Sequence, residues 1–344
     1  MRHGTVAWRS KVKKQLLAHF YQRPEQYVSG EKLSRQLQCT RAAIWKTIEE
    51  LRKEGYRIEA VPNRGYRLVS GPDKLLPHEI QARLSSRWAG CQIHFFERLS
   101  STQQKAHELA KEGAPHGTVV VAEEQTGGRG RLGRPWHSPP GTGVWLSLIL
   151  RPTLSLEQLS QLTLMTAVAL VDAIRDGFQP GDGCAPDDIR IKWPNDVYVL
   201  MGDGTQKKVC GILTEVHAEM DRIHSCIVGV GMNVNQEADD FPPDIRDKAT
   251  SLALATGRPW SRVRLAVGFL QQFEKWYETY VQQGFTAVKN DWEKRALPLG
   301  TPMQVQLQNR RVQGIYAGLT DQGALLFRQS DGQIVTVHSG DVLL

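Results

Sequence analysis

The first fifty residues alternate between short amphipathic segments and tight turns. Apolar positions recur every three or four residues over 11–21, which predicts a helix with one buried face. A shorter helix over 31–38 and a longer one over 41–54 follow, and Thr40 stands where a side-chain oxygen can cap the longer helix. A short helix, a turn of a few residues and a longer helix are the pattern of a helix-turn-helix.

After Gly55 the period of the pattern changes to two, which indicates a β-hairpin over 56–68 with a Pro-Asn-Arg-Gly turn at its tip. A hairpin in this position would be the wing of a winged helix-turn-helix. The third predicted helix has one apolar face, and we expect its polar residues to point away from that face. The residues expected to reach DNA are Arg41, Lys46 and Thr47 on this helix and Arg64 on the wing.

Charge supports a nucleic-acid partner for this segment. Residues 1–70 hold 15 Lys and Arg against 6 Asp and Glu, a net charge of +9, while the whole chain carries +7, so the remainder carries −2. A basic surface confined to one domain is typical of a module that binds a polyanion. A protein-interaction module is the simpler alternative, and the charge and Arg64 favour nucleic acid.

Between 75 and 297 helix-like and strand-like segments alternate, which predicts a mixed α/β domain. The expected helices cover 102–112, 156–176 and 262–283, and the expected strands cover 118–123, 143–150, 209–216 and 224–230. Beyond Pro298 short β-like segments separated by glycine turns predict a small barrel. We therefore expect a DNA-binding domain at 1–70, an α/β domain at 75–297 and a small β domain at 298–344.

Composition narrows the class of protein. At 344 residues the chain exceeds the ~250–300 residues at which a single core usually stops growing, so several domains are expected. No run approaches the ~18 apolar residues of a membrane span, and no N-terminal run resembles a secretory signal, so we expect a cytoplasmic protein without a membrane partner. The five cysteines form no C-x-x-C pair, which argues against a bound structural metal or a disulfide framework.

The segment 128–136, Gly-Arg-Gly-Arg-Leu-Gly-Arg-Pro-Trp, carries the clearest chemical signal. It matches G-x-G-x-x-G, but a dinucleotide-binding loop must open a helix, and Pro135 with the Ser-Pro-Pro-Gly at 138–141 prevents this. Glycines that admit a ligand close to the backbone, together with arginines that bind phosphate or carboxylate groups, favour an anionic ligand. A solvated basic turn is the simpler alternative.

Two further parts of the chain add to this signal. Lys192 follows the strand-like segment 189–191 and precedes Trp-Pro-Asn-Asp, so it can project a point charge into a cleft. The segments 207–215 and 229–235 are the other part, and in 229–235 spaced glycines on an apolar strand let a ligand or another backbone approach closely. For these glycines a packing role is an equal alternative.

These segments occur in the order and approximate spacing of one family. GRGRLGRPW, KWPND, GILTE and GVGMNVN together resemble the biotin protein ligases, and 29–33, 40–46 and 61–66 resemble the head of the members that also repress the biotin operon. The resemblance covers the whole chain. It implies an α+β multidomain protein with an N-terminal winged helix-turn-helix, a central mixed α/β domain like that of class II synthetases, and a C-terminal SH3-like β-barrel.

The resemblance also implies a two-step reaction. Biotin and ATP, with Mg²⁺, give biotinyl-5′-AMP, and a lysine of a biotin carboxyl carrier protein then attacks the mixed anhydride. By their places in the family's motifs, Lys192, Arg129 and Arg131 would be catalytic. The residues expected to bind biotin or the adenylate are Ser101, Thr102, Gln103, Gln125, Arg129, Gly130, Arg131, Trp136, Lys192, Gly211 and Asn233. In two departures from the family, Leu132 stands where a basic residue is common, and 179–188 and 201–206 resemble longer surface loops.

The implied partners are the carrier protein, operator DNA and a second copy of the chain, joined through the central domain when the adenylate is bound. A lipoate ligase, whose central fold is related, is the alternative among enzymes, and the arginine-glycine loop with KWPND favours biotin. A biotin-sensing repressor without ligase turnover is the alternative outside enzymes. Intact Lys192, Arg129 and Arg131 argue against that alternative.

Overall fold

A computed structural model describes residues 2–219, 222–306 and 311–343 of the protein. The chain divides into two compact units, Met1–Ser85 and Ser86–Leu344, which we describe separately. Within the described ranges no helix has the length and apolar character that crossing a bilayer requires.

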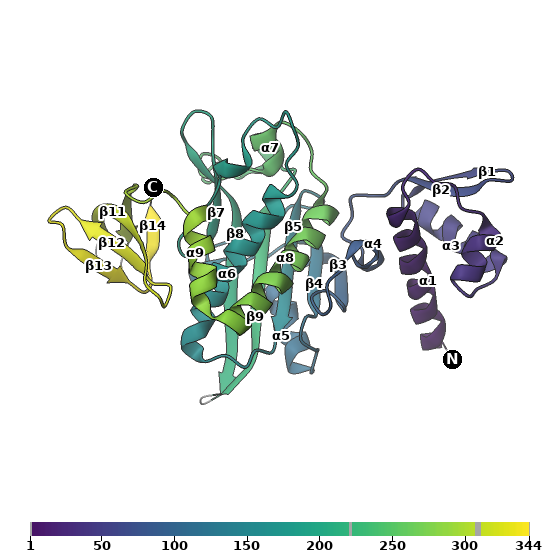
Figure 1. Ribbon diagram of the computed structural model, residues 1–344, viewed down its shortest axis with the longest axis horizontal. Coiled ribbons are helices and arrows are strands. Elements are labelled where there is room, and N and C mark those ends of the chain that lie inside the picture. The colour runs from purple at the N-terminus through teal and green to yellow at the C-terminus, as the bar shows by residue number, and fades with distance from the viewer. Residues whose placement is uncertain (1, 220–221, 307–310, 344) are drawn as a thin grey trace. The chain divides into compact units, whose positions relative to one another are not determined.

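The first unit is a small helical core with a β-hairpin. Its elements are α1 (Arg2–Gln22), α2 (Gly30–Gln36), α3 (Arg41–Lys53), β1 (Arg57–Val61), β2 (Gly65–Ser70) and α4 (Pro77–Arg83) (Figure 1). Thr40 Oγ1 accepts a hydrogen bond from the Ala43 amide at 3.1 Å, so the predicted cap of α3 is confirmed. The apolar sides of the helices meet in a core formed by Leu16, Leu17, Phe20, Leu33, Ile44, Ile48, Leu51, Tyr56 and Ile58.

A buried carboxylate attaches α4 to this core. Glu79 is 1% exposed and accepts hydrogen bonds from the hydroxyls of Tyr21 and Tyr56, each at 2.6 Å, and from Arg83 Nη2 at 2.7 Å. Burial, and after it Glu79, raises the pKa of both tyrosines, so they remain hydrogen-bond donors at neutral pH. Since a buried carboxylate needs partners for its charge and its lone pairs, this cluster fixes α4 against α1 and the hairpin base.

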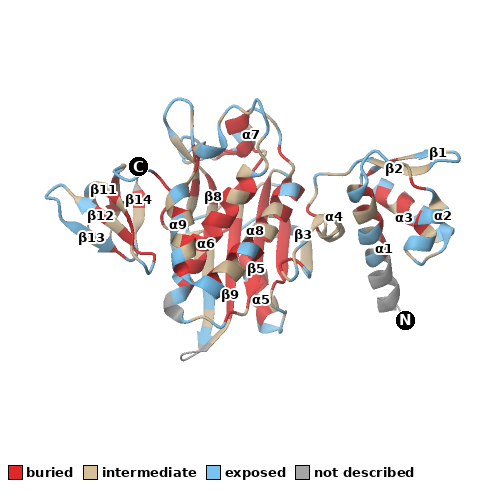
Figure 2. Ribbon diagram, in the orientation of Figure 1, coloured by how far each residue is buried: buried red, intermediate tan, exposed pale blue. Residues whose placement is uncertain are grey.

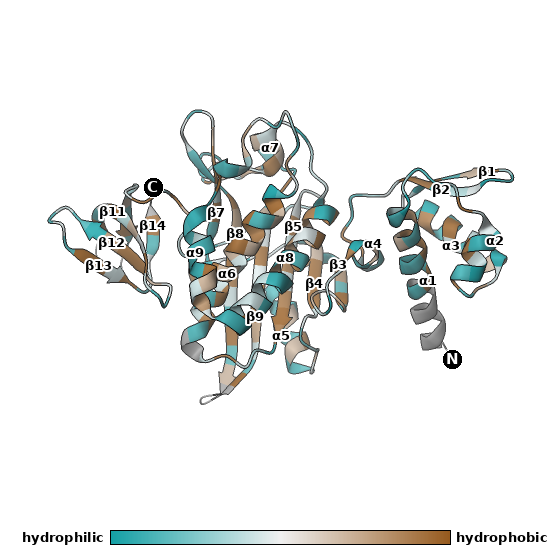
Figure 3. Cartoon of the chain, viewed as in Figure 1, coloured by the Kyte–Doolittle hydropathy of each residue, from teal (hydrophilic) through white to brown (hydrophobic). Residues whose placement is uncertain are grey.

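The second unit is built on a seven-stranded sheet in the order β3-β4-β5-β9-β8-β7-β6. Its strands are β3 (Ile93–Leu99), β4 (Val119–Gln125), β5 (Gly143–Leu150), β6 (Ile189–Lys192), β7 (Asp196–Leu200), β8 (Gln206–Glu219) and β9 (Arg222–Asn233). β3 and β4 are parallel and every other neighbouring pair is antiparallel. All eight residues of β5 are buried, and apolar colour is concentrated on the central strands (Figures 2 and 3).

Helices cover the two faces of this sheet. α5 (Thr102–Lys111) packs on β4, β5 and β9, whereas α6 (Leu156–Arg175) packs on β6, β7 and β8. α8 (Arg262–Gln283) and α9 (Phe285–Arg295) pack against α6, and α7 (Leu252–Thr256) is a single short turn of helix. In Figure 1 α6 and α8 lie in front of the sheet and α5 lies behind it.

The chain ends in a small antiparallel sheet, as the turn spacing predicted. Its strands are β10 (Pro302–Gln306), β11 (Arg311–Leu319), β12 (Leu325–Gln329), β13 (Ile334–Val337) and β14 (Asp341–Leu343), in the order β13-β12-β11-β10-β14. β14 pairs with β10 through Gln306 and Asp341, and through Val305 and Val342. This pairing fixes the direction of the last side chains described.

The predicted helices and strands are confirmed, although several ends differ. α1 begins at Arg2, well before the predicted start, and β8 extends beyond 209–216 on both sides. The sequence analysis missed β3, β7, α4, α7 and α9. In α9 the buried residues Phe285, Val288 and Trp292 are too few to give a strong periodic signal.

Replacing Glu79 with alanine is expected to destabilise the first unit by about 1–3 kcal/mol, because two buried hydroxyls lose their acceptor. Hydrogen–deuterium exchange of the full-length protein measures this: amides of α1 and α4 should exchange faster, and those of β5 should not change. Glu79→Gln keeps one carbonyl acceptor, so its exchange rates in α1 and α4 should lie between those of the wild type and of Glu79→Ala. Unchanged exchange in α4 of the alanine variant would contradict the assigned role.

Candidate functional site

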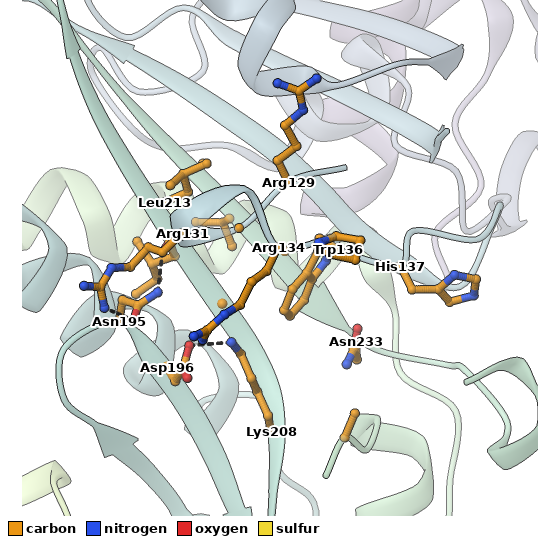
Figure 4. A pocket seen from close by; sticks show the side chains of 18 of the residues that line it. Arg129, Arg131, Arg134, Trp136, His137, Asn195, Asp196, Lys208, Leu213 and Asn233 are labelled. Atoms are coloured by element: carbon orange, nitrogen blue, oxygen red, sulfur yellow. Dashed lines mark hydrogen bonds and ion pairs between the residues drawn. The ribbon is translucent and has the colours of Figure 1, made fainter. Parts of the chain in front are cut away.

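A cavity of about 440 Å³ lies in the second unit, lined by the start of α5, the segment 128–136, strands β6 to β9 and strand β14. All the residues that the sequence predicted to bind a ligand line it: Ser101, Thr102, Gln103, Gln125, Arg129, Gly130, Arg131, Trp136, Lys192, Gly211 and Asn233. They come from segments that are far apart in the sequence. Figure 4 shows part of this cavity.

One end of the cavity carries neutral polar groups that hold one another in place. Gln125 Oε1 accepts hydrogen bonds from the Thr102 amide at 2.8 Å and the Thr102 hydroxyl at 3.0 Å, and Gln125 Nε2 donates to Ser138 Oγ at 2.9 Å. Ser147 Oγ lies 2.9 Å from Thr102 Oγ1 and 3.0 Å from Gln103 Oε1. Fixed donors and acceptors of this kind suit a small neutral ring that also has both.

Glycines make room for an aromatic ring beside this end. Gly211 on β8 and Gly231 on β9 are register partners, and a Cβ on them would stand 2.9 Å and 2.3 Å from the Trp136 indole. A Cβ on Gly229 would stand 2.4 Å from Gln103 Oε1. The packing alternative therefore holds for Gly229 and Gly231, because the Gln103 and Trp136 side chains fill the space that a Cβ would need, and both side chains line the cavity.

Lys192 is buried where β6 ends, with 8% of its surface exposed. Its Nζ donates to Tyr198 Oη at 2.7 Å and to the Val342 carbonyl at 3.1 Å, and stands 3.9 Å from Asp196 Oδ2. Burial lowers the pKa of Lys192 to about 8, a shift that Asp196 opposes. An anion bound beside this amine would favour its charged form.

A second lysine lies across the same carboxylate. Lys208 Nζ is 2.5 Å from Asp196 Oδ1 and 5.1 Å from the centre of the Trp136 ring, and Figure 4 shows it pointing toward Asp196. The cationic end of the cavity therefore adjoins the aromatic surface. This arrangement suits a ligand with an anionic group next to a flat ring.

The arginine loop, residues 128–136, is an irregular turn. Residues 131–133 form a short 3₁₀ turn with Leu132 at φ 57°, and no α-helix follows before β5, so the dinucleotide-binding interpretation is excluded. Arg131 Nη1 donates to Asn195 Oδ1 at 3.1 Å. Arg129 is exposed, and its guanidinium points away from Asp196 and Lys208 in Figure 4.

Sequence reasoning missed the contribution of the last strand. Asp341 pairs with Arg134 and lies 3.7 Å from Arg131 Nη1, and the neighbouring Val342 carbonyl accepts from Lys192. A single aspartate between short β-like segments gives no signal of such a contact. Other lining residues outside the predicted set include Tyr198, Asp196, Lys208, Ser147, Gly229 and Lys248. Lys208 lies inside a segment already singled out, and its charge could have drawn attention to it.

Asn233 lines the cavity but is held by the protein. Its Nδ2 donates to the Thr250 carbonyl at 3.1 Å, and its Oδ1 accepts from Gln236 Nε2 at 3.2 Å. These bonds fix both ends of the loop that carries Phe241, Ile245 and Lys248 into the cavity wall. The loops 179–188 and 201–206 contribute no residue to the lining.

On the first unit the candidate DNA-contacting cations are solvent-exposed, as predicted: Arg41 and Lys46 on α3 and Arg64 at the hairpin tip. The Arg64 guanidinium lies 4.4 Å from the centre of the Tyr27 ring, which restricts where it can point. The predicted exposure of Thr47 is wrong. Thr47 is 6% exposed and its hydroxyl donates to the Ala43 carbonyl at 2.9 Å, because it lies beside Ile44 and Ile48 on the buried side of α3.

Comparison with known proteins divides the chain into three matched segments. An HTH domain model matches 12–67, the model of the Biotin/lipoate A/B protein ligase family matches 95–233, and the Biotin protein ligase C terminal domain matches 299–344.

Full-length relatives are also found. The Bifunctional ligase/repressor BirA of Bacillus subtilis (strain 168) is 46% identical, over 98% of this chain and 99% of its own length. The Escherichia coli (strain K12) protein of the same name is 28% identical, over 93% of each chain. The structure of a biotin protein ligase from Aquifex aeolicus in complex with biotin and ATP aligns with a TM-score of 0.60 and 31% identity, over 74% of this chain and 98% of that chain.

Gly231→Ala is expected to lower the free energy of unfolding of the second unit by about 1–3 kcal/mol, because the new Cβ overlaps the Trp136 indole. Urea unfolding followed by tryptophan emission measures this. In a Trp136→Ala background the same substitution should cost little, since the overlapping ring is gone. Gly268→Ala, whose Cβ would meet Ala173 at an ordinary 3.6 Å, is the control. An equal cost with and without the indole would contradict the packing argument.

Proposed function

The chain belongs to the biotin protein ligase family, and on this premise we propose that it joins biotin to ATP as biotinyl-5′-AMP and transfers the biotinyl group to a lysine of a carrier protein. The observation that carries the proposal is one cavity with a neutral polar end at Gln125 and a cationic end at Lys192. Biotin has the matching form, because its ureido ring is neutral and its carboxylate lies at the far end of a short chain.

At the polar end the ureido ring would be held by Ser101, Thr102 and Gln103. The ring offers two N–H donors and one carbonyl acceptor, so it needs hydroxyl and amide groups rather than charge. Gln125 keeps Thr102 oriented through its two hydrogen bonds. The side chains are therefore already in place before a ligand enters, which reduces the entropy that binding must cost.

At the cationic end the biotin carboxylate oxygen would attack the α-phosphorus of ATP, and pyrophosphate would leave. Two anions must approach one another in this step, so fixed positive charge is the main help that the protein can give. Lys192 would supply it at the reacting oxygens, with Arg129 and Arg131 acting from the loop. Trp136, which lies over Gly211, would pack beside the adenine, and Asn233 would hold the adjoining wall.

Magnesium is proposed to enter with ATP, as the counter-ion of its phosphates. In nucleotide sites Mg²⁺ keeps several waters and uses one or two protein carboxylates in addition to the phosphates. Asp196 fits this requirement, because it lies in the cavity between Lys192 and Lys208. In the described part of the chain no three His, Cys, Asp or Glu side chains form a metal cage. The Asp196 carboxylate would therefore hold the ion together with the ATP phosphates, and the ion would neutralise part of their charge.

In the second step the amine of a biotin carboxyl carrier protein would attack the anhydride carbonyl, and AMP would leave. The first unit is proposed to bind operator DNA through α3 and the hairpin. Dimerisation through the second unit, favoured by bound adenylate, would place two heads on one duplex and couple repression to biotin supply. ATP, the carrier and the operator are cytoplasmic, so the protein is proposed to act there.

Lys192→Ala is expected to slow pyrophosphate release ~10²–10³-fold while weakening biotin binding less, because the charge is needed most as the anions meet. The wild-type profile against pH tests the same residue. With the Lys192 pKa near 8 in the free protein, the cation is present below pH 8 and lost above it, so kcat/KM for adenylation should fall as pH rises through about 8.

Lys192→Arg is the matched variant for this profile. Arginine stays charged throughout, so the alkaline fall in kcat/KM should disappear even if the absolute rate is lower. An alkaline fall that persists in the arginine variant would assign it to another group. Pyrophosphate release near the wild-type rate in Lys192→Ala would exclude the proposed role.

Lys46→Glu and Arg64→Glu are each expected to weaken binding to the organism's own biotin-synthesis promoter at least tenfold in gel-shift titrations with biotin and ATP present. Lys14→Glu, an exposed change of equal charge on α1, should have a much smaller effect because it lies outside α3 and the hairpin. Equal losses in all three variants would mean that only net charge matters. Binding by the wild type that ignores biotin and ATP would exclude the coupling.

A further inference from the structure

A carboxylate stands in a cavity that otherwise favours anions. Six Arg or Lys side chains line the cavity, Arg129, Arg131, Arg134, Lys192, Lys208 and Lys248, together with the carboxylates of Asp196 and Asp341. Asp196 is adjacent to both lysines of the cationic end. Asp341 lies on β14, near the end of the chain. Its negative charge repels any phosphate nearby, so its presence in the cavity needs a physical reason.

The contacts of Asp341 indicate that reason. One carboxylate oxygen pairs with Arg134 Nη2, and the other lies 3.7 Å from Arg131 Nη1. The side chain keeps only 20% of its surface exposed. The backbone of Asp341 is also held in place. Asp341 pairs with Gln306 in the terminal sheet, and the carbonyl of the next residue, Val342, accepts a hydrogen bond from Lys192.

The arginine loop itself faces solvent. Leu132 is 81% exposed and the Arg134 side chain 64% exposed, and the loop closes on itself through a hydrogen bond of 2.8 Å from the Gly130 amide to the Arg134 carbonyl. The Trp136 indole anchors the last residue of the loop on the sheet, but the turn over 129–134 has little apolar contact to fix it. The position of this turn over the cavity depends on what its guanidinium groups bind, which are Asn195 for Arg131 and Asp341 for Arg134.

We propose that Asp341 is a positioning residue, which holds the arginine loop over the cavity before and after the anionic ligand binds. It acts through Arg134 and Arg131 and does not touch the reacting atoms. This inference rests on the proposed function, because it concerns how long the biotinyl adenylate is retained. The loop is then preorganised, and the small terminal domain controls access to a site formed mainly by the central sheet.

The first test needs no ligand and no activity. Trypsin must draw several residues on each side of Arg129 or Arg131 into its own cleft, so an exposed arginine is not sufficient and the turn has to leave its position. The cleavage rate therefore reports the open population. In the full-length protein Asp341→Asn should raise cleavage at these two sites about three- to tenfold, the range expected for losing a partly exposed, charge-assisted pair. Asp331→Asn, on a turn of the same domain where asparagine can keep the hydrogen bond to the Gln333 amide, should leave it unchanged.

A double-mutant cycle checks that the effect passes through the loop. Arg134→Gln should raise ligand-free cleavage to a similar extent, and adding Asp341→Asn to it should change little further. Additive effects of the two substitutions, or cleavage unchanged in Asp341→Asn, would overturn the proposal.

The second test measures retention. Preformed biotinyl-5′-AMP should dissociate about three- to tenfold faster from Asp341→Asn than from the wild type, with kcat for adenylation affected less than KM. Slower dissociation, or tighter ATP binding in the variant, would show that Asp341 competes with phosphate for the arginines and would overturn the proposal. If the wild type forms no adenylate, the proposed function fails, whereas the cleavage test still decides whether Asp341 holds the loop.

Discussion

The need to gather positive charge in one cavity is the constraint on which the rest of the second unit depends. Lys192 is buried at the end of β6, and burial lowers its pKa to about 8. The carboxylates of Asp196 and Asp341 oppose this fall in the Lys192 pKa. The amine can therefore stay buried and still charge fully when an anion arrives, since a bound anion raises its pKa.

The second condition is that the arginine loop approaches strands β8 and β9 closely, and glycines on these strands make this possible. Gly211 and Gly231 face each other across β8 and β9, and the absence of a Cβ at both positions leaves room for the Trp136 indole on the sheet. The ring in turn sets the width of the cavity between the sheet and the arginine loop. A methyl group at either glycine would displace the ring. These two glycines therefore shape the cavity, whereas its charged and polar groups come from other residues.

The two units solve different electrostatic problems. In the first unit the cations Arg41, Lys46 and Arg64 are exposed on the surface. The same unit buries one carboxylate, Glu79, which links α4 to the core. The second unit places cations inside a cavity and supplies carboxylates as counter-charges. Exposed cations suit a long polyanion that brings many phosphates, whereas enclosed ones suit a small ligand whose charge must be recognised at a few atoms.

By itself the sequence determined most of the local structure and singled out residues that the structure places in the wall of one cavity. The periodicity located α3, α6, α8 and β5, and the arginine loop and Lys192 were recognised from residue type and neighbours, because such signals lie within a few positions of one another. The tertiary structure decided which groups meet. Thr47 is buried because it lies on the side of α3 that packs against the core. Asp341 contacts Arg134 although the two residues are 207 positions apart in the sequence. Contacts of that kind depend on the pairing of β14 with β10 and on the packing of whole strands, which no local pattern encodes.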